Sequence, residues 1–374
     1  MRSVAKAFGV SLLTVQRWVE RARGLRLDRV DWSDRLPGRR CAVNRTPRKT
    51  EDKVLTVRQE LRAESDLGNF GAAAIEREMR RRRCRNVPGA RTIGYILKRR
   101  GALDGRHKPY QPAPPRGWYL PDVGAGEVEL DSFDVVEGLV IQGGQQVEVL
   151  NGTSLHGGLI TSSPMASVSA KEATQALCEH WRDVGLPAYA QFDNDTRFQG
   201  PHQHADALGR VIRLCLSLGV MPVFAPPRET GFQAAIENLN GRWQAKVWAR
   251  FHHDSLTGLR EQSDRFVTAC RRHAAERIQS APPRRAFPRR WRLNLQAAPR
   301  GAIVYLRRTS EHGAVSVLGH TFTVDPQWPH RLVRAVVDLE AERIRFYALR
   351  RRAPLHQPLL QTTRYSLPIR PFQE

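Results

Sequence analysis

A proline-rich stretch, residues 107–121, divides this chain into two parts with different sequence patterns. It contains five prolines, and proline does not fit the interior of a helix or a central strand. We therefore interpret residues 107–121 as a linker. Before it, apolar residues recur at helical spacing; after it, short alternating segments predict strands mixed with helices. The length of 374 residues is enough for two or more domains with separate cores.

Residues 1–48 contain a candidate helix-turn-helix that runs from Val4 to Gly24. Phe8 and Val10 are expected to pack the first helix and the turn, Ser11 to cap the second helix, and Val19 to face inward. The residues expected on the outward side, where they can meet DNA bases and phosphates, are Thr14, Gln16, Arg17 and Arg21. An ordinary helical hairpin is the alternative.

Residues 49–106 predict a second DNA-binding helical unit with three amphipathic helices. The arginine run from Arg80 to Arg83 is interpreted as a phosphate contact, with a solvated helix end as the alternative. The last helix of this unit carries polar and basic residues that are expected to contact DNA, and these are Arg91, Thr92, Lys98 and Arg99.

The charge of the chain is unevenly distributed. Residues 1–120 hold 29 basic and 12 acidic residues, residues 121–250 hold 9 and 15, and the remainder holds 22 and 10. Basic flanks suit a polyanion, because lysine and arginine displace counterions from phosphates. An acidic middle would repel the same polyanion unless divalent cations bridged them. A basic ribosomal or chromatin protein would have no evident need for the acidic middle.

The five cysteines are far apart and form no Cys-x-x-Cys pair. This argues against a zinc site or a disulfide framework and favours a reducing cytoplasm. The sequence also has no apolar signal core, and no apolar run reaches the roughly 18 residues of a membrane span. We expect a cytoplasmic protein associated with the nucleoid.

Beyond the linker, the pattern predicts a core domain over residues 122–285. Ser169-x-x-Glu172 is a capping box for a helix that ends near Val184. Further strands are expected between residues 296 and 352, and their short length and close spacing suggest a small β-barrel. Residues 353–374 are interpreted as a tail. The strands expected in the core are Glu127–Phe133, Gly138–Gln142, Val147–Leu150, Gly157–Ile160, Ala188–Phe192 and Val220–Phe224.

Three carboxylates stand at positions that suit a shared site. Asp131 lies inside a predicted strand, Asp193 follows the strand Ala188–Phe192, and Glu237 lies beside the apolar stripe of a predicted helix. Taken alone, each is more simply a solvated surface charge, since the chain has 37 acidic residues. Acidic residues nearby that offer substitutes are Asp134, Asp195 and Glu129.

The order of these residues resembles the Asp-Asp-Glu triad of the retroviral-integrase-like transposases, the DDE family. The matching motifs are Asp131, Asp193-Asn194-x-x-x-Phe198 and Glu237-x-x-Asn240, with 44 positions between Asp193 and Glu237. Asp195 stands where a glycine is usual, and Gln244 stands where a basic residue often follows. The stretches 71–75 and 91–101 resemble the second helix-turn-helix of the same proteins.

The resemblance implies a multidomain α and α/β protein: helix-turn-helix units, a ribonuclease-H-like core and a small C-terminal β-barrel. It implies two Mg²⁺ or Mn²⁺ ions, with Asp131 bridging them and Asp193 and Glu237 each holding one. The implied activity is metal-dependent cleavage of element ends and strand transfer into target DNA by a homo-oligomer on double-stranded DNA, with an ATPase as a possible targeting partner. The alternatives are a sequence-specific DNA-binding regulator with an inactive core and a nuclease without strand transfer.

Overall fold

The computed structural model describes residues 1–33, 46–66, 68–103, 116–201, 204–229, 231–351 and 353–373. Most of the predicted linker, residues 107–115, lies outside the described residues. The linker's last part does not behave as a linker, because Trp118, Tyr119 and Leu120 are buried against Phe232 and the central sheet. Within the described part of the chain, no helix is both long and apolar enough to cross a membrane.

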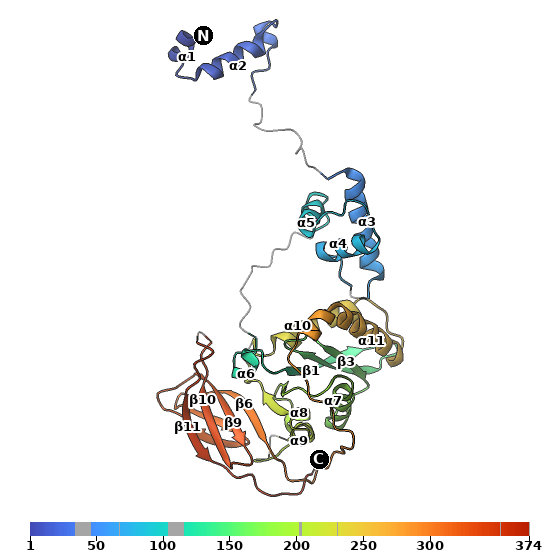
Figure 1. Ribbon diagram of the computed structural model, residues 1–374, viewed down its shortest axis with the longest axis vertical. Helices are drawn as coiled ribbons and strands as arrows, with labels where there is room; N and C mark the ends of the chain where they lie inside the picture. The colour runs from blue at the N-terminus through green and yellow to red at the C-terminus, as the bar shows by residue number, and fades with distance from the viewer. Residues whose placement is uncertain are drawn as a thin grey trace.

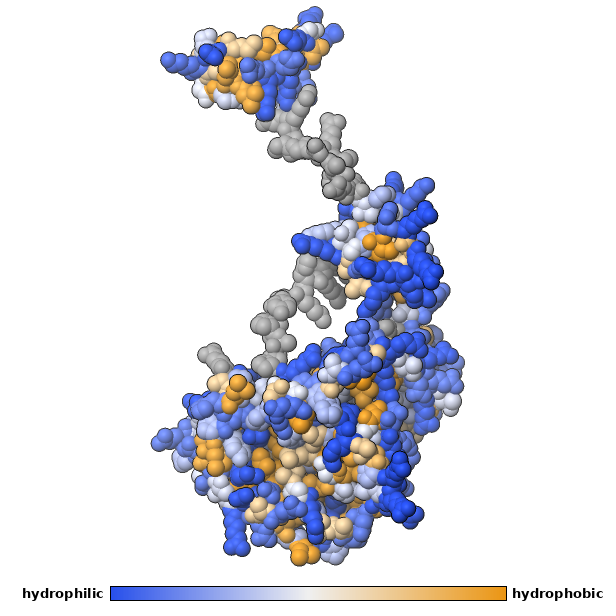
Figure 2. Space-filling view, in the orientation of Figure 1, coloured by the Kyte–Doolittle hydropathy of each residue, from blue (hydrophilic) through white to orange (hydrophobic). Residues whose placement is uncertain are grey.

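Two helices, α1 (Arg2–Ala7) and α2 (Leu12–Ala22), form the N-terminal unit, which Figure 1 shows apart from the other elements. Ser11 caps α2 as predicted, because its side chain accepts from the backbone N–H of Thr14. The expected packing of Phe8, Val10 and Val19 is wrong: these side chains are 76%, 41% and 47% exposed. Two short helices enclose too little volume to bury them, and Figure 2 shows apolar side chains on the surface of this unit.

The second helical unit consists of α3 (Arg48–Glu64), α4 (Ala72–Arg81) and α5 (Ala90–Arg99). Its apolar side chains come from all three helices and form a small core around Val54, Ile75, Met79 and Ile96, each fully or almost fully buried. The predicted three amphipathic helices are therefore present.

A mixed sheet of nine strands forms the centre of the molecule, in the order β11-β10-β9-β6-β5-β4-β1-β2-β3 (Figure 1). Parallel pairs join β1, β4, β5 and β6, and antiparallel pairs complete both sides. The first five strands are β1 (Leu130–Val140), β2 (Gln146–Ser154), β3 (Ile160–Met165), β4 (Tyr189–Phe192) and β5 (Met221–Phe224).

Two predictions of strand position in the core are wrong. The strand expected at Gly157–Ile160 is instead β3, which begins at Ile160 and ends at Met165. The two strands predicted at Glu127–Phe133 and Gly138–Gln142 are largely one strand, β1, with an irregular register between Val136 and Leu139. Gly138 lies in that irregularity with a φ of 71°, a backbone conformation that glycine adopts without strain. A bulge therefore produced the apparent break in the pattern.

The C-terminal strands extend the core sheet, and the expectation of a separate barrel is not met. β6 pairs in parallel with β5, and Tyr305 of β6 stacks on Phe224 of β5 with ring centres 5.2 Å apart. Among the described residues the sheet ends at β11, inside the predicted tail, and no pairing closes a barrel. These strands are β6 (Ala302–Arg308), β9 (Leu332–Asp338), β10 (Arg343–Ala348) and β11 (Leu359–Arg364), with a separate hairpin of β7 (Ala314–Val317) and β8 (His320–Thr323).

Helices cover both faces of the sheet. Apolar residues of α7 and α9 pack on one face with Phe133, and those of α10 and α11 pack on the other with Val149. Ser169 caps α7 as the capping box predicts, accepting from the N–H groups of Lys171 and Glu172. The helices are α6 (Pro121–Gly124), α7 (Ala170–Val184), α8 (Thr196–Gln199), α9 (Arg210–Ser217), α10 (Ala234–Trp243), α11 (Leu256–His273) and α12 (Ala275–Gln279).

The α3–α5 unit contacts the central domain just beyond α10. A short π-helix, Gln244–Trp248, follows α10 directly. Its Lys246 donates to the carbonyl of Gly68 at 2.6 Å and lies over the ring of Phe70. Arg250 donates to the carbonyls of Ala63 and Ser65. The loop between α3 and α4 is thereby fastened to the helix that carries Glu237.

Candidate active site

Asp131, the first predicted carboxylate, is held in a buried ion pair away from the other two. Its side chain is 1% exposed, and Arg284 donates to both carboxylate oxygens at 2.9 and 2.6 Å. Trp181 of α7 donates to the same carboxylate at 3.1 Å, and His180 lies 3.8 Å away. These contacts occupy the oxygens that a metal would need. The assignment of Asp131 as a bridging metal ligand does not fit this structure.

The face of the strand explains this difference. Side chains alternate between the two faces of a strand, so Asp131 and Asp134 point in opposite directions. Asp131 faces α7, whereas Asp134 faces α10. The register of β1 with β4 pairs Asp131 with Ala190. Continued along both chains, this register brings Asp134 level with Asp193 and on the same face of the sheet.

A hydrogen-bonded chain holds Asp134 against α10. Asn240 donates to Asp134 Oδ2 at 2.7 Å, and Asn151 of β2, the register partner of Asp134, donates to Asn240 at 2.9 Å. The backbone N–H of Val135 donates to the other carboxylate oxygen of Asp134 at 3.0 Å. Asn240 belongs to the Glu-x-x-Asn motif, and it lies one helical turn from Glu237 on the same side of α10. The motif therefore connects Asp134 to the helix of Glu237.

Asp193 and Glu237 are both close enough to Asp134 for their charges to act on it. Asp193 comes directly after β4 and accepts from the N–H of Asp195 at 3.1 Å, which fixes the turn into α8. Glu237 occupies the first turn of α10, where the helix dipole favours a negative charge, and its side chain is exposed.

The charges of Asp193 and Glu237 act on Asp134. Burial, followed by the negative charges of Asp193 and Glu237, raises the pKa of Asp134 to about 6, against the hydrogen bonds from Val135 and Asn240. Burial is also the main cause that raises the pKa of Asp193, while the N–H of Asp195 lowers it. Like charges that share a site disfavour simultaneous ionisation, and a bound cation relieves this repulsion.

The carboxylates do not form a ready metal cage. Among the residues that the structure describes, no group of three or more histidine, cysteine, aspartate or glutamate side chains is close enough together to hold a metal ion. The donor chemistry nevertheless suits magnesium, which prefers carboxylate oxygens and uses only one or two of them besides water and phosphate.

The other two substitute carboxylates have structural roles. Glu129 is 1% exposed and accepts from the N–H groups of His156 and Gly157, both at 2.8 Å, so it fixes the turn after β2. Asp195 caps α8 and binds Arg197, which also pairs with Glu137. Of the three substitutes named from the sequence, Asp134 is the one that the structure places with Asp193.

The residues of α2 that are predicted to contact DNA differ in how exposed they are. Gln16 and Arg17 are exposed. Thr14 is partly buried, and its hydroxyl is 2.8 Å from that of Ser11. Arg21 stacks on Trp18 and donates to the carbonyl of Ser33 at 3.0 Å. Gln16 and Arg17 are therefore the more accessible members of the predicted set.

On α5, the exposed side contains Arg91, Thr92 and Lys98, together with Tyr95, which is 57% exposed. Tyr95 was absent from the predicted set, although its spacing of four from Arg91 and three from Lys98 places it on the same face. Arg99 instead pairs with Glu51 of α3, whose side chain is 3% exposed. The structure therefore shows a helix-packing role for Arg99.

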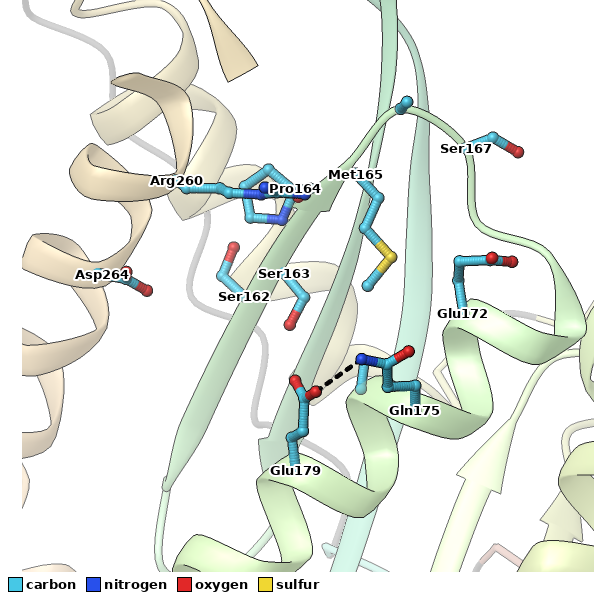
Figure 3. Close-up of a pocket in the computed structure, with 12 residues that line it drawn as sticks. Ser162, Ser163, Pro164, Met165, Ser167, Glu172, Gln175, Glu179, Arg260 and Asp264 are labelled. Carbon is cyan, nitrogen blue, oxygen red and sulfur yellow. Dashed lines mark hydrogen bonds between the residues drawn. The ribbon is translucent and has the colours of Figure 1, made fainter. Parts of the chain in front are cut away.

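A cavity of about 600 Å³ between β3, α7 and α11 lies at the far edge of the sheet (Figure 3). Two carboxylates of its lining are hydrogen-bonded: Glu179 accepts from Gln175, and Glu172 accepts from the cap residue Ser169. Arg260 points across it and donates to the carbonyl of Pro164 at 2.9 Å. These contacts hold α7 and α11 against the edge strand β3. They do not bring catalytic groups together in the cavity.

No protein-family model matches this chain, and no curated protein matches it. Among solved structures, it is similar to a chain of the simian T-cell lymphotropic virus intasome in complex with PP2A regulatory subunit B56 gamma. The identity is 12% and the TM-score 0.32, over 71% of this chain and 84% of that chain.

Two integrase catalytic cores are also similar. The HTLV-2 integrase catalytic core domain in complex with magnesium has 12% identity and a TM-score of 0.27, covering 42% of this chain and 87% of that one. The BIV integrase core has 12% identity and a TM-score of 0.28, covering 38% and 80%. At such low scores the likeness supports no residue role, so the function is argued from this chain's own residues.

Proposed function

We propose that this protein is a metal-dependent DNA transposase or integrase, a polynucleotidyl transferase that cleaves element ends and joins them to target DNA. The observation that carries the proposal is the hydrogen bond of 2.7 Å between Asn240 and Asp134. This hydrogen bond joins β1 to α10, and the parallel pairing of β1 with β4 supports the inclusion of Asp193. The proposed triad is Asp134, Asp193 and Glu237. Asp134 replaces Asp131 in the proposed triad.

The proposed cofactor is a pair of Mg²⁺ or Mn²⁺ ions. When bound between two or three carboxylates, such ions make the attacking oxygen nucleophilic and stabilise the leaving oxygen of a phosphodiester. Asp134, Asp193 and Glu237 would hold them. Glu237 is exposed and has room to turn toward the other two, which fits a site that closes only when the cations and DNA arrive.

The remaining residues of the site orient these ligands. Asn240 fixes one oxygen of Asp134, and the N–H of Val135 fixes the other, so the carboxylate cannot rotate freely. The N–H of Asp195 restrains Asp193 in the same way. Such restraint keeps donor oxygens in place and lowers the cost of assembling the reactive geometry.

DNA is the proposed substrate because segments rich in lysine and arginine precede and follow the acidic segment of the sequence that contains the proposed site. The flanks 1–120 and 251–374 are strongly basic, whereas residues 121–250 are acidic. We assign DNA contacts to Gln16, Arg17, Arg91, Thr92 and Lys98, with Thr14 and Arg21 supporting α2. Two ends must be joined to one target, so a homo-oligomer on DNA is expected.

Strand transfer in vitro tests the proposal. Labelled duplexes from the two borders of the DNA that carries this gene are incubated with supercoiled plasmid and Mg²⁺ or Mn²⁺. The wild-type protein should give joined product, and Asp134→Asn, Asp193→Asn and Glu237→Gln should each lower the rate by at least about 10²-fold. Glu261→Gln, which changes an exposed carboxylate on α11, is the matched control and should retain full activity.

Two other outcomes would overturn the proposal. Specific DNA binding without any joined product, equal in the wild type and the three variants, would indicate a regulator with an inactive core. Nicked plasmid without joined product would indicate a nuclease. Retained activity in Asp134→Asn would remove Asp134 from the triad.

A further inference from the structure

A second polar cavity lies beside the Asp193 loop, on the side of the sheet where the C-terminal strands begin. Its volume is about 470 Å³, and its lining includes Asn194, Gln199, Arg307, Arg308 and Ser316. It is formed by three parts of the chain that are distant in sequence: the loop after β4, the end of β6 and the hairpin β7–β8. Of its two arginines, Arg307 has no acidic partner among the described residues.

Arg307 is a largely buried cation without an acidic partner. Nη1 donates to the carbonyls of Leu306 at 2.9 Å and Ala225 at 3.4 Å, and Nε donates to the carbonyl of Ser316 at 3.3 Å. Within the described residues, Nη2 has no hydrogen-bond partner, and no carboxylate forms an ion pair with Arg307. Burial lowers the pKa of Arg307 to about 10, and Tyr305, whose ring centre is 4.9 Å from the guanidinium carbon, acts in the opposite direction.

Its neighbour on the strand provides a comparison. Arg308 pairs with Glu229, and this contact raises the pKa of Arg308. Adjacent residues on β6 thus have opposite electrostatic surroundings. The guanidinium of Arg307 lies over the ring of Tyr305 and donates to backbone carbonyls, and none of these contacts neutralises its charge. It therefore retains the capacity to bind an anion, and its fork of donors matches two oxygens of a phosphate.

The cavity adjoins the proposed active site through one carbonyl group. The Ala225 carbonyl accepts from Arg307 Nη1 at 3.4 Å and from Asn194 Nδ2 at 2.6 Å. Asn194 follows Asp193 directly in the chain. Arg307 and the residue that follows Asp193 therefore share one hydrogen-bond acceptor, the Ala225 carbonyl.

We propose that this cavity binds a phosphate group of the DNA strand under attack, with Arg307 as its principal ligand. This assignment rests on the proposed function for the identity of the strand. The contact would hold the phosphate next to the scissile one and so fix the position of the strand relative to Asp134, Asp193 and Glu237. Arg307 is a positioning residue in this arrangement.

Inorganic phosphate and DNA are the two probes that test this site. Sodium phosphate should raise the thermal unfolding midpoint of the wild-type protein above that in sodium chloride of equal ionic strength. Arg307→Gln should lose this increase, and Arg307→Lys should retain part of it. In strand transfer, Arg307→Gln should raise KM for DNA about ten-fold or more with little change in kcat, since it loses a charged hydrogen bond.

Arg213→Gln is the matched control. Arg213 also donates to backbone carbonyls and has a pKa lowered by burial, but it does not line this cavity. Its loss should cost stability without changing the phosphate effect. For DNA, the slope of log affinity against log salt should become shallower by about 0.9 in Arg307→Gln and stay unchanged in Arg213→Gln.

A substitution that adds a carboxylate to the cavity tests the site without changing Arg307. Ser316 is exposed at the cavity, so Ser316→Glu should fold and should compete with phosphate for the guanidinium. An unchanged phosphate effect in both Ser316→Glu and Arg307→Gln would overturn the site. A phosphate effect that disappears in Arg307→Gln, with DNA binding and KM unaltered, would overturn the assignment to DNA.

These experiments distinguish a failure of the proposed function from a failure of the proposed phosphate site. Asp193→Asn should retain the phosphate effect while losing strand transfer. If no variant or wild-type protein joins DNA yet the phosphate effect depends on Arg307, the anion site stands and the proposed function does not. If strand transfer occurs with wild-type KM in Arg307→Gln, the proposed function stands and the site does not.

Discussion

Asp131 and Asp134 lie three positions apart on β1, and the electrostatic surroundings of their carboxylates are opposite. Asp131 is compensated by a bidentate arginine and is part of the packing under α7. Asp134 has no cationic partner among its strongest interactions, and its pKa is raised. A carboxylate that is stabilised in the absence of metal gains little from binding one, whereas a destabilised carboxylate gains much.

The pH dependence of stability should reveal Asp134. Its pKa is about 6 in the folded protein against an ordinary value of 3.8. The folded protein therefore holds this proton more tightly than the unfolded chain, and the free energy of unfolding should fall as pH rises from about 4 to about 6. The contribution is on the order of 1–3 kcal/mol.

Urea unfolding at several pH values measures this effect. Asp134→Asn should flatten the pH dependence in that window and should be more stable than the wild type at pH 7. Mg²⁺ should weaken the wild-type dependence, because a cation favours the charged carboxylate. An identical pH profile in wild type and Asp134→Asn would contradict the prediction.

Asp131→Asn should destabilise the protein, in contrast to Asp134→Asn. It leaves the partly buried Arg284 without its carboxylate, and breaking one side of a buried pair costs about 3–5 kcal/mol. Thermal unfolding checks the size of the loss. Replacement of both Asp131 and Arg284 by apolar residues should recover part of the stability, whereas a stable Asp131→Asn single variant would show that the ion pair contributes little.

At this scale the sequence predicted the chemistry of the site better than its members. The motifs at Asp193 and Glu237 point to the site that we propose, and Asp134 is one of the substitutes that the sequence offers for Asp131. The alternation of the strand alone could not decide which face was which, because both faces of β1 are buried. The choice depends on Arg284, more than 150 residues away, and distant ion pairs leave no mark on local periodicity.

Among the helices and strands, those whose boundaries depend on neighbouring residues in the sequence were predicted well. The capping serines of α2 and α7 lie where the pattern placed them, and β7, β9 and β10 lie within a residue or two of expectation. The bulge at Gly138 was not recognised, because a glycine between apolar residues looks like a strand boundary. β11 was missed because it is an edge strand with no buried residue, so its sequence carries no alternation of buried and exposed side chains.

Ser169→Ala should weaken α7. The side chain accepts from the N–H groups of Lys171 and Glu172, and loss of such a cap costs about 1 kcal/mol. Chemical denaturation measures the change. Ser167→Ala, an exposed serine in the preceding loop, is the control and should change the free energy of unfolding by less than about 0.5 kcal/mol. Equal effects of the two substitutions would argue against the cap.

Lys98→Ala on α5 should weaken DNA binding by a purely electrostatic route. Lys98 is exposed on the face that also carries Arg91 and Thr92. Loss of one phosphate contact should reduce the slope of log affinity against log salt by about 0.9. Lys171→Ala, an exposed lysine of α7, is the control in a fluorescence anisotropy titration. A slope that changes equally in both variants would contradict a DNA-facing role for α5.

For the whole molecule, the main departure from expectation is that the C-terminal strands share the core sheet. The local pattern correctly indicated short strands, but not which strands they pair with. Sheet membership is decided by β5, whose second edge is covered by β6, and by the stacking of Phe224 on Tyr305. Such pairing depends on the complete fold, so the expected independent barrel could not be distinguished from an extension of the sheet.

Truncation tests this arrangement. A chain ending at Pro299 exposes the edge of β5 and its apolar neighbours, so we expect it to aggregate or to lose cooperative unfolding. A chain ending at Ile369 lacks only residues beyond β11 and is the control. Calorimetry of the control should show the central domain unfolding as in the full chain. A soluble, cooperatively folded chain ending at Pro299 would indicate that the C-terminal strands fold independently.

The contact of Lys246 and Arg250 with residues 63–70 has a mechanical consequence. Lys246 belongs to the π-helix that continues α10, and α10 carries Glu237 at its other end. If α3–α5 binds DNA as we propose, a displacement of that unit would act through Lys246 and Arg250 on the helix that carries Glu237. DNA binding by α3–α5 and the position of the third proposed carboxylate would then be coupled.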